Sequence, residues 1–335
     1  MNPKRILVTG ASGCIGHYIC EALIEDTEHE LYLLVRDPQK LKLDVNVRPG
    51  IHVIQGNMRE IDALRGLLST IDVAILTAAA WGGEQEAFDI NVTKTVRLLQ
   101  LLDPEVCEQV VYFSTESVLD QQNQLLKAAG ALGTDYIRSK YIALSQIQRL
   151  AIAPKITTLF PTLVFGGDGQ KPYSHLSAGL PDVVKWIGLV KFFRGDGSFH
   201  FIHARDIALV VRRLVDCPPA ADEPRWLVLG NPAMTVDEAV EQACNYFGQP
   251  IRFRMPLPLW SADFFIAAFR IQMAAWDRFC LEYRHFTHEN PANPATFGMT
   301  SFCPTLADIF KTRGILPDEL SSQLARESNP NESAG

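Results

Sequence analysis

The chain has 335 residues, of which 47% are hydrophobic and 21% charged, a balance typical of a globular protein with about two domains. This composition excludes a disordered chain, a collagen-like fibre and a small disulfide-linked scaffold. The 31 basic and 38 acidic residues leave a net charge of −7, so we expect no nucleic-acid partner.

The seven cysteines are scattered and form no C-x-x-C pair, which predicts free thiols in a reducing compartment. The histidines include two H-x-x-H pairs, His200/His203 and His285/His288, but neither forms an H-E-x-x-H motif, so we expect no bound metal. No targeting segment precedes the first apolar run, which favours a cytoplasmic location.

The most apolar late stretch, residues 257–276, is interrupted by Asp263 and Arg270. A helix that spans a bilayer needs about 20 mostly apolar residues. We therefore expect no membrane span.

Short apolar runs alternate with helical patterns through the first half of the chain. The predicted strands cover 6–8, 31–35, 51–54, 73–76, 110–113 and 156–159. The helices predicted between them cover 15–25, 61–68, 88–102 and 135–152. Continuous apolar strands that alternate with helices indicate a parallel sheet covered on both faces. The predicted fold class is α/β, a Rossmann-type doubly wound parallel sheet.

The pattern changes after Pro161. The later elements are predicted as a helix near 181–189, a helix over 204–215, a strand over 226–229, and a helix that begins at Thr235 with Glu238 completing a capping box. We assign 1–165 to the Rossmann domain, with 200–220 returning to it. We assign 166–199 and 221–325 to a smaller α/β lobe for substrate, and 326–335 to a disordered tail.

The first predicted strand runs directly into a glycine-rich turn and then a helix. The turn contains Gly10, Gly13 and Gly16. Such glycines permit a tight turn, close backbone approach to a pyrophosphate and close packing of helix on strand. The helix N-terminus then presents unpaired N–H groups to the phosphates. Because no Gly-Lys-Ser/Thr follows, the pattern favours a dinucleotide over the nucleotide of a P-loop protein.

The second predicted strand ends at Arg36 and Asp37, where the adenosine ribose of a dinucleotide would lie. An arginine there can pair with a 2′-phosphate, whereas a carboxylate accepts hydrogen bonds from the ribose 2′-OH. Arg36 comes first, so we favour NADP(H). Asp37 keeps NAD as the alternative.

The fifth predicted strand ends in Ser114 and Thr115, and Tyr136 and Lys140 follow on a predicted helix. Residues four apart share one helix face, so this tyrosine and lysine can approach the same ligand. An ammonium near a phenol favours the phenolate, which predicts a lowered pKa for Tyr136 and suits a general acid/base. Together with a strand-end hydroxyl, they indicate a proton-transfer site.

These motifs, in this order, resemble the extended short-chain dehydrogenase/reductase superfamily, also described as the NAD-dependent epimerase/dehydratase family. The glycine turn fits its T-G-x-x-G-x-x-G, and Asn91-Val92-Thr93-Lys94-Thr95 is similar to its N-V-x-G-T helix. Further similar segments are Phe113–Val118, Tyr136 with Lys140, 160–166 (R-P-x-x-V-Y-G) and 201–208 (F-I-H-V-D-D-V-A).

The resemblance implies roles for individual residues. Tyr136 would exchange the proton with substrate, and Lys140 would bind the nicotinamide ribose. Thr115 would hold the substrate carbonyl, with Ser114 as the alternative, and Asn91 would help to organise the site. The implied cofactor contacts are Gly10, Ser12, Gly13, Cys14, Ile15, Gly16, Arg36, Asn57, Met58, Ala78, Ala79, Asn91, Tyr136, Lys140, Pro161 and Leu163. The resemblance also implies a homodimer through the helices that carry Asn91 and Tyr136.

Three departures from the family pattern bear on the substrate. Glu116-Ser117 follows Thr115 where the family's dehydratases have Asp-Glu, and dehydration needs both an acid and a base. Phe160 and Arg205 replace an arginine and an aspartate of the family motifs. These changes argue against nucleotide-sugar chemistry.

The C-terminal segment carries a Pro-Leu-Pro entry, 256–258, followed by an apolar helical stretch. This arrangement resembles the 3β-hydroxysteroid dehydrogenase and dihydroflavonol reductase side of the family, whose substrates are apolar. Trp186, Phe192 and Phe193 are candidates to line the same pocket, and packing in the core is an equal alternative for them.

We therefore expect an NADP(H)-dependent oxidoreductase that acts on the carbonyl or alcohol of a small, apolar substrate. An NAD-dependent nucleotide-sugar epimerase is the alternative. A non-catalytic dinucleotide sensor or assembly protein is a hypothesis from a different class, because fold alone does not give function.

Overall fold

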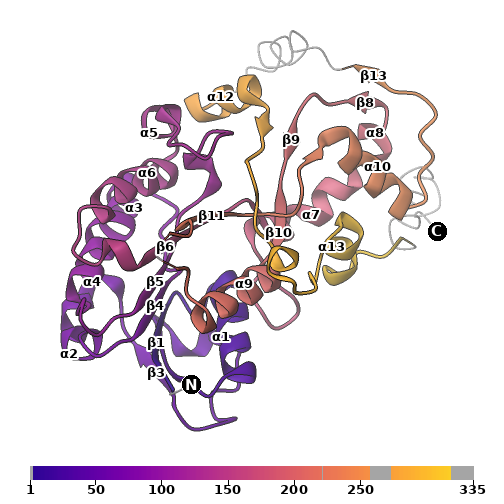
Figure 1. Cartoon of the computed structure of the whole chain (residues 1–335). Coiled ribbons are helices and arrows are strands. Elements are labelled where there is room, and N and C mark those ends of the chain that lie inside the picture. Colours follow the sequence, from indigo (N-terminus) through magenta and orange to yellow (C-terminus); the bar gives the residue numbers. More distant parts are fainter. Residues whose placement is uncertain (1–2, 221, 257–272, 318–335) are drawn as a thin grey trace, which may run out of the picture.

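The computed structural model of the chain describes residues 3–220, 222–256 and 273–317. Its centre is a seven-stranded parallel sheet with strand order β11-β6-β5-β4-β1-β2-β3 (Figure 1). The strands are β1 (Arg5–Thr9), β2 (Glu30–Val35), β3 (Ile51–Gln55), β4 (Val73–Leu76), β5 (Gln109–Phe113), β6 (Ile156–Pro161) and β11 (Trp226–Leu229). This is the doubly wound arrangement expected from the sequence, and its order reverses between β1 and β4.

The strand Trp226–Leu229 corrects one boundary of the domain assignment. We placed 221–325 in the smaller lobe, but β11 pairs in parallel with β6. These residues therefore extend the main sheet.

Each strand feeds two hydrophobic cores because successive side chains point to opposite faces. In β2, Leu31 and Leu33 join the core under α1 (Cys14–Asp26) and α9 (Ala204–Asp216), whereas Leu34 joins the core on the other face. The elements of that second face are η2 (Met58–Leu64), α2 (Arg65–Leu68), α3 (Glu84–Phe88), η3 (Asp89–Lys94), α4 (Thr95–Leu101), α5 (Lys127–Leu132) and α6 (Asp135–Ile147). Helix α9 packs on α1, whereas β10 (Phe201–His203) pairs with β7 (Leu163–Phe165) in a separate sheet.

Three helices differ from their predicted form. The segment predicted as one helix over 88–102 contains a π-helix, η3, before α4. The helix predicted over 61–68 is a 3₁₀ segment followed by the short α2, and the helix predicted over 135–152 ends at Ile147. Periodicity alone does not separate these helix types, because all of them bury one face.

The smaller part of the chain surrounds a third core (Figure 1). Its elements are β7 (Leu163–Phe165), α7 (His175–Lys185), α8 (Ile187–Val190), β8 (Phe193–Arg194), β9 (Ser198–Phe199), β10 (Phe201–His203), β12 (Met234–Thr235), α10 (Val236–Tyr246), β13 (Met255–Pro256), α12 (Ala275–Tyr283), β14 (His285–Phe286), η6 (Pro294–Phe297) and α13 (Leu306–Thr312). The capping box of Thr235 and Glu238 is confirmed at the start of α10.

Two predictions fall on parts of the chain outside the described residues: most of the apolar stretch 257–276, and the tail 326–335. Within the described ranges, no helix has the length and apolar character needed to cross a bilayer.

Candidate functional site

A cavity of about 1140 Å³ lies where the carboxyl ends of β1 to β6 meet. This edge is where doubly wound folds bind their ligands. Segments that follow these strands line it, together with α6 and the start of α7. The cavity contains all but one of the site residues expected from the sequence.

The glycine turn after β1 has no room for side chains. Gly10 has φ +71°, and a Cβ there would lie 2.7 Å from the backbone nitrogen of Ala78. A Cβ on Gly16 would lie 2.1 Å from the carbonyl oxygen of Gly10. The turn therefore brings bare backbone to the cavity wall, as close contact with a pyrophosphate requires.

Helix α1 begins at this turn with its N-terminus free of side-chain caps. Its N-cap is Gly13, no acidic side chain lies in its first turn, and Ser12, Cys14 and Ile15 line the cavity. Open N–H groups and the positive end of the helix dipole fit a pyrophosphate. Burial raises the pKa of the Cys14 thiol to about 12, so it adds no negative charge at neutral pH.

Basic side chains gather where the adenosine ribose of a dinucleotide would lie. Arg36 after β2, Lys40 in η1 (Pro38–Lys40) and Arg59 after β3 all line the cavity. Asp37 does not line it; its carboxylate accepts the backbone N–H of Gln39 at 3.0 Å and caps η1. The sequence analysis identified Arg36 but missed the other two cations.

Small and polar residues complete this end of the cavity. Asn57 and Met58 line it as expected, and the Asn57 side-chain oxygen accepts the backbone N–H of Arg59 at 3.1 Å. An amide oxygen has two lone pairs, so one is left for an adenine amino group. Ala78 and Ala79 form the wall after β4, and Pro161 and Leu163 line the cavity beyond β6.

Asn91 is the exception, because it does not line the cavity although we included it among the cofactor contacts. It is fully buried in the π-helix η3. Its side chain accepts the N–H of Ala80 and donates to the carbonyl of Ala80, both at 2.8 Å, and it donates to Ser139 Oγ at 2.9 Å. Asn91 thus ties the chain after β4 to helix α6 and positions residues of the wall.

Helix α6 presents Tyr136 and Lys140 to the cavity. Its N-cap Thr134 accepts the backbone N–H of Ile137, which fixes the start of the helix. Lys140 Nζ donates to the carbonyl oxygen of Phe113 at 2.7 Å and lies 5.9 Å from the centroid of the Tyr136 ring. The pair is thereby attached to the end of β5.

The pKa of Tyr136 differs from our expectation. We expected Lys140 to lower it, but burial raises the pKa of this phenol above its ordinary value. Burial also lowers the pKa of Lys140, to about 7. Near pH 7, the Lys140 ammonium is protonated only part of the time. Its attraction for a Tyr136 phenolate is therefore smaller than the free energy that burial of that phenolate costs. Tyr136 is therefore a protonated phenol in this state, able to donate.

Both strand-end hydroxyls, Ser114 and Thr115, line the cavity. Thr115 Oγ1 lies 3.4 Å from the backbone nitrogen and from the hydroxyl oxygen of Ser117. Ser114 Oγ is buried and has no hydrogen-bond partner among the described residues. A buried hydroxyl without a partner is costly, so Ser114 is suited to bind a ligand oxygen.

Two aromatic residues of the wall were missed by the sequence analysis. Trp81 lies in the loop after β4, and its ring stacks on Tyr136 with centroids 4.0 Å apart. The ring centroid of His175, the first residue of α7, lies 5.1 Å from that of Trp81. No motif in the sequence marked either residue.

Three other aromatic residues, Trp186, Phe192 and Phe193, for which pocket lining and core packing were both open, do not line the cavity. Trp186 is 63% exposed, and Phe192 packs on Phe253 with ring centroids 5.2 Å apart. They lie beyond α7, which itself forms the wall.

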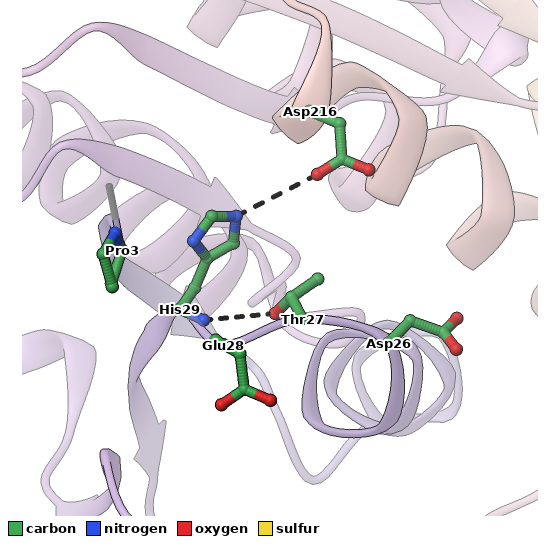
Figure 2. A pocket seen from close by; sticks show the side chains of 6 residues that line it. All are labelled: Pro3, Asp26, Thr27, Glu28, His29 and Asp216. Atoms are coloured by element: carbon green, nitrogen blue, oxygen red, sulfur yellow. Dashed lines mark hydrogen bonds and ion pairs between the residues drawn. The ribbon is translucent and has the colours of Figure 1, made fainter. Parts of the chain in front are cut away.

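A second hollow, of about 280 Å³, lies far from this edge and is lined by acidic side chains (Figure 2). There, His29 Nε2 lies 4.0 Å from Asp216 Oδ1, which links the segment before β2 to the end of α9. Nothing in it provides a glycine turn or a helix N-terminus. Across residues 3–220, 222–256 and 273–317, no cluster of three His, Cys, Asp or Glu side chains is arranged to hold a metal.

Comparison with known proteins places this site in a family. The model of the NAD dependent epimerase/dehydratase family matches residues 6–230. The uncharacterized UDP-glucose epimerase YtcB of Bacillus subtilis is 31% identical over 133 residues, which are 35% of this chain and 42% of that protein. Phenylcoumaran benzylic ether reductase IRL1 of Ginkgo biloba is 30% identical over 103 residues, 29% of this chain and 32% of that protein. The match thus spans less than half of either relative.

Solved structures show the same fold at low identity. The Bordetella bronchiseptica enzyme WbmG in complex with NAD and UDP has a TM-score of 0.61 at 14% identity, covering 94% of this chain and 97% of that one. UDP-glucose-4-epimerase of Stenotrophomonas maltophila, with NAD and formylated UDP-arabinopyranose, has a TM-score of 0.62 at 16% identity, covering 96% and 99%.

Proposed function

Because the chain belongs to the NAD dependent epimerase/dehydratase family, we propose that it is an NADP(H)-linked oxidoreductase that transfers a hydride to or from a small, largely apolar carbonyl or alcohol. Membership of this family makes it an enzyme that depends on a nicotinamide dinucleotide. The observation that carries the proposal is that Tyr136, Lys140 and the hydroxyls of Ser114 and Thr115 share one cavity with an open helix N-terminus.

Three basic side chains support NADP(H) over NAD. Arg36, Lys40 and Arg59 line the ribose end, while the Asp37 carboxylate is used as a helix cap. Arginine pairs with a phosphate through two parallel hydrogen bonds, so Arg36 suits a 2′-phosphate. The family description names NAD, and NAD remains the alternative cofactor.

Each residue of the site has its own role in the proposed reaction. The bound dinucleotide supplies or accepts the hydride. In the direction of carbonyl reduction, Tyr136 donates its proton to the substrate oxygen, and Ser114 or Thr115 donates a hydrogen bond to that same oxygen. Lys140, held by the carbonyl of Phe113, stabilises the resulting phenolate through its positive charge.

The charges on the cavity wall support an apolar substrate. Of the described residues that line it, the lysines and arginines are Arg36, Lys40, Arg59 and Lys140. The first three belong to the ribose end, and the ammonium of Lys140 is bonded to Phe113. A nucleotide sugar carries a diphosphate, which needs cations at the substrate end. The lining includes Trp81, and its other apolar members include Ile90, Ile137, Tyr173 and Leu176.

The epimerase alternative is supported by the name of the Bacillus subtilis relative, an uncharacterized UDP-glucose epimerase, and by the family, which includes epimerases. An epimerase would interconvert a nucleotide sugar such as UDP-glucose with no net use of added dinucleotide. Our proposal predicts no conversion of UDP-glucose and steady oxidation of NADPH with apolar ketones. The hypothesis of a non-catalytic sensor is disfavoured, because the chain belongs to an enzyme family and keeps Tyr136 and Lys140.

The experiment is to measure ketone-dependent NADPH oxidation by wild type, Tyr136→Phe and Tyr141→Phe. Tyr141 lies on the same helix but does not line the cavity, so it is the matched control. We expect Tyr136→Phe to lower kcat by about 100-fold or more and to leave the affinity for NADPH unchanged. Tyr141→Phe should keep the kcat of wild type. Equal activity of the two variants would refute the role of Tyr136.

Two further proposals concern the protein in the cell. A homodimer through the helices that carry Asn91 and Tyr136 is supported by the family resemblance, and light scattering after size-exclusion chromatography tests it. A cytoplasmic location is supported by the seven free cysteines, which suit a reducing compartment.

A further inference from the structure

A buried carboxylate–imidazole pair joins the cavity wall to the C-terminal part of the chain. Glu116 follows Thr115 directly, begins η4 (Glu116–Val118) and lines the cavity. His288 approaches it from the segment after β14, with 3.2 Å between Nε2 and Glu116 Oε2. The His288 side chain is only 2% exposed. Hydride transfer with Tyr136 as the acid does not require this pair.

The hydrogen bonds of His288 require a proton between the two side chains. Nδ1 of His288 lies 3.1 Å from the carbonyl oxygen of Asp120, which can only accept, so Nδ1 carries a hydrogen. Nε2 faces a carboxylate oxygen. A bare nitrogen lone pair against a buried, ionised carboxylate would be repulsive. One proton therefore lies between Nε2 and Oε2, on one side or the other.

Three titratable side chains that neighbour the pair, those of His200, Cys280 and Tyr283, are uncharged at neutral pH. His200 Nδ1 lies 2.8 Å from the carbonyl oxygen of Asn231, and its Nε2 accepts the backbone N–H of His288 at 3.0 Å. Burial lowers the pKa of His200, which keeps it neutral. On α12, burial raises the pKa of Cys280 to about 11 and also raises the pKa of Tyr283. Among these three neighbours, no charged side chain therefore attracts or repels the proton that Glu116 and His288 share.

The second carboxylate oxygen of Glu116, Oε1, can accept a further hydrogen bond. Its contact among the described residues is Ser117 Oγ at 3.5 Å, and that hydroxyl lies 3.4 Å from Thr115 Oγ1. Thr115, Glu116 and Ser117 all line the cavity. The pair therefore adjoins the hydroxyl assigned to the reacting oxygen, and it offers an acceptor next to it.

We propose that the Glu116–His288 pair binds a second oxygen of the substrate, a hydroxyl on the carbon beside the reacting carbonyl, and so selects hydroxy ketones or diols over simple ketones or alcohols. This inference rests on the proposed function and narrows its substrate class. The substrate hydroxyl donates to Glu116, and His288 keeps the carboxyl group in place through its contact with Oε2. The rest of the substrate meets the apolar wall.

The test compares two probes that differ by one hydroxyl, 2-hydroxyacetophenone and acetophenone. Each is titrated by calorimetry into the NADP⁺-saturated protein as wild type, Glu116→Gln and Glu289→Gln. Glu289 is exposed and adjoins His288 in sequence, so it is the matched control. We expect wild type and Glu289→Gln to bind the hydroxylated probe about 10-fold or more tightly than acetophenone. In Glu116→Gln the two affinities should become equal.

A second readout separates binding from a merely structural role. The imidazole ¹⁵N signal of His288, assigned by its loss in His288→Gln, should shift with 2-hydroxyacetophenone and not with acetophenone. Equal affinities of the probes for wild type, or an unchanged His288 signal, would overturn the inference. Either result leaves NADPH binding and the Tyr136→Phe effect as they are, so failure of the proposed function is seen separately.

Discussion

The indole ring of Trp81 lies flat against the phenol ring of Tyr136, with centroids 4.0 Å apart and planes inclined by 10°. Trp81 is 59% exposed, whereas Tyr136 is buried. Asn91 holds both backbone groups of Ala80, the residue before Trp81. The site therefore places an aromatic ring directly beside Tyr136, the proton donor that we propose.

The Trp81 wall predicts a preference for substrates with flat apolar rings. Trp81→Ala should lower kcat/KM for an aromatic ketone by about 3- to 10-fold, because ring stacking contributes roughly this much beyond area burial. A small aliphatic ketone should be affected less, and Trp81→Phe should retain the preference. Steady-state NADPH oxidation measures all three, and an equal loss for both ketones would show that Trp81 only supports Tyr136.

Gly16→Ala should disrupt the phosphate-binding turn. The new Cβ would meet the carbonyl oxygen of Gly10 and the Cα of Ala11, which are backbone atoms that cannot move aside. We expect the free energy of unfolding to fall by about 2 kcal/mol or more, and dinucleotide binding to be lost. The control is Gly179→Ala in α7, where a Cβ meets nothing within 4 Å. It should stabilise the protein by about 0.5–1 kcal/mol in urea unfolding, and matching losses in the two variants would contradict the account.

Lys140 should make stability depend on pH. Its pKa falls from the ordinary lysine value of 10.5 to about 7 in the folded chain, because burial penalises the charged form. Between these values the unfolded lysine binds a proton and the folded one does not, so the free energy of unfolding rises with pH. From pH 7 to 9, wild type should gain about 1 kcal/mol per pH unit relative to Lys140→Met. Urea unfolding from pH 7 to 9 measures this difference. If the free energies of unfolding of wild type and Lys140→Met change in parallel with pH, the pKa of Lys140 is not lowered.

Arg313 should stabilise the cavity wall by compensating a proline inside α7. Pro181 has no N–H for the carbonyl oxygen of Ser177, and Arg313 Nε donates to that oxygen instead, at 2.8 Å. The guanidinium also lies 4.0 Å from the ring centroid of Tyr173, which lines the cavity. Arg313→Met should lower the free energy of unfolding by about 1–3 kcal/mol.

The matched control for Arg313 is Lys311→Met on α13. Lys311 is exposed, so this loss of one positive charge should change stability by no more than about 0.5 kcal/mol. Thermal and urea unfolding measure both variants. If Arg313→Met and Lys311→Met lose the same free energy of unfolding, the hydrogen bond from Arg313 to the carbonyl oxygen of Ser177 does not stabilise the protein.

Features encoded locally were predictable from the sequence. The run of buried residues in β1, the glycines at 10, 13 and 16 and the four-residue spacing of Tyr136 and Lys140 each depend on neighbours in the chain. Because carboxyl ends of parallel strands meet at one edge, local motifs were enough to assemble the cavity wall.

Features made by distant residues were not predictable in the same way. Glu116 and His288 meet across 172 positions, and no local pattern marks either partner. The raised pKa of Tyr136 depends on burial under Trp81 and its neighbours, which periodicity does not measure. The pairing of β11 with β6 likewise needed the tertiary fold, since a short apolar strand suits either lobe.

We propose that the ribose end of the cavity recognises a 2′-phosphate through Arg36. The most direct measurement is a fluorescence titration of NADPH and NADH on wild type, Arg36→Ala and Arg149→Ala, where Arg149 is an exposed arginine that does not line the cavity. We predict that wild type and Arg149→Ala bind NADPH about 10- to 100-fold more tightly than NADH, and that Arg36→Ala loses most of this preference. Equal binding of the two dinucleotides to wild type, or an unchanged preference in Arg36→Ala, would contradict the account and favour an NAD-dependent epimerase.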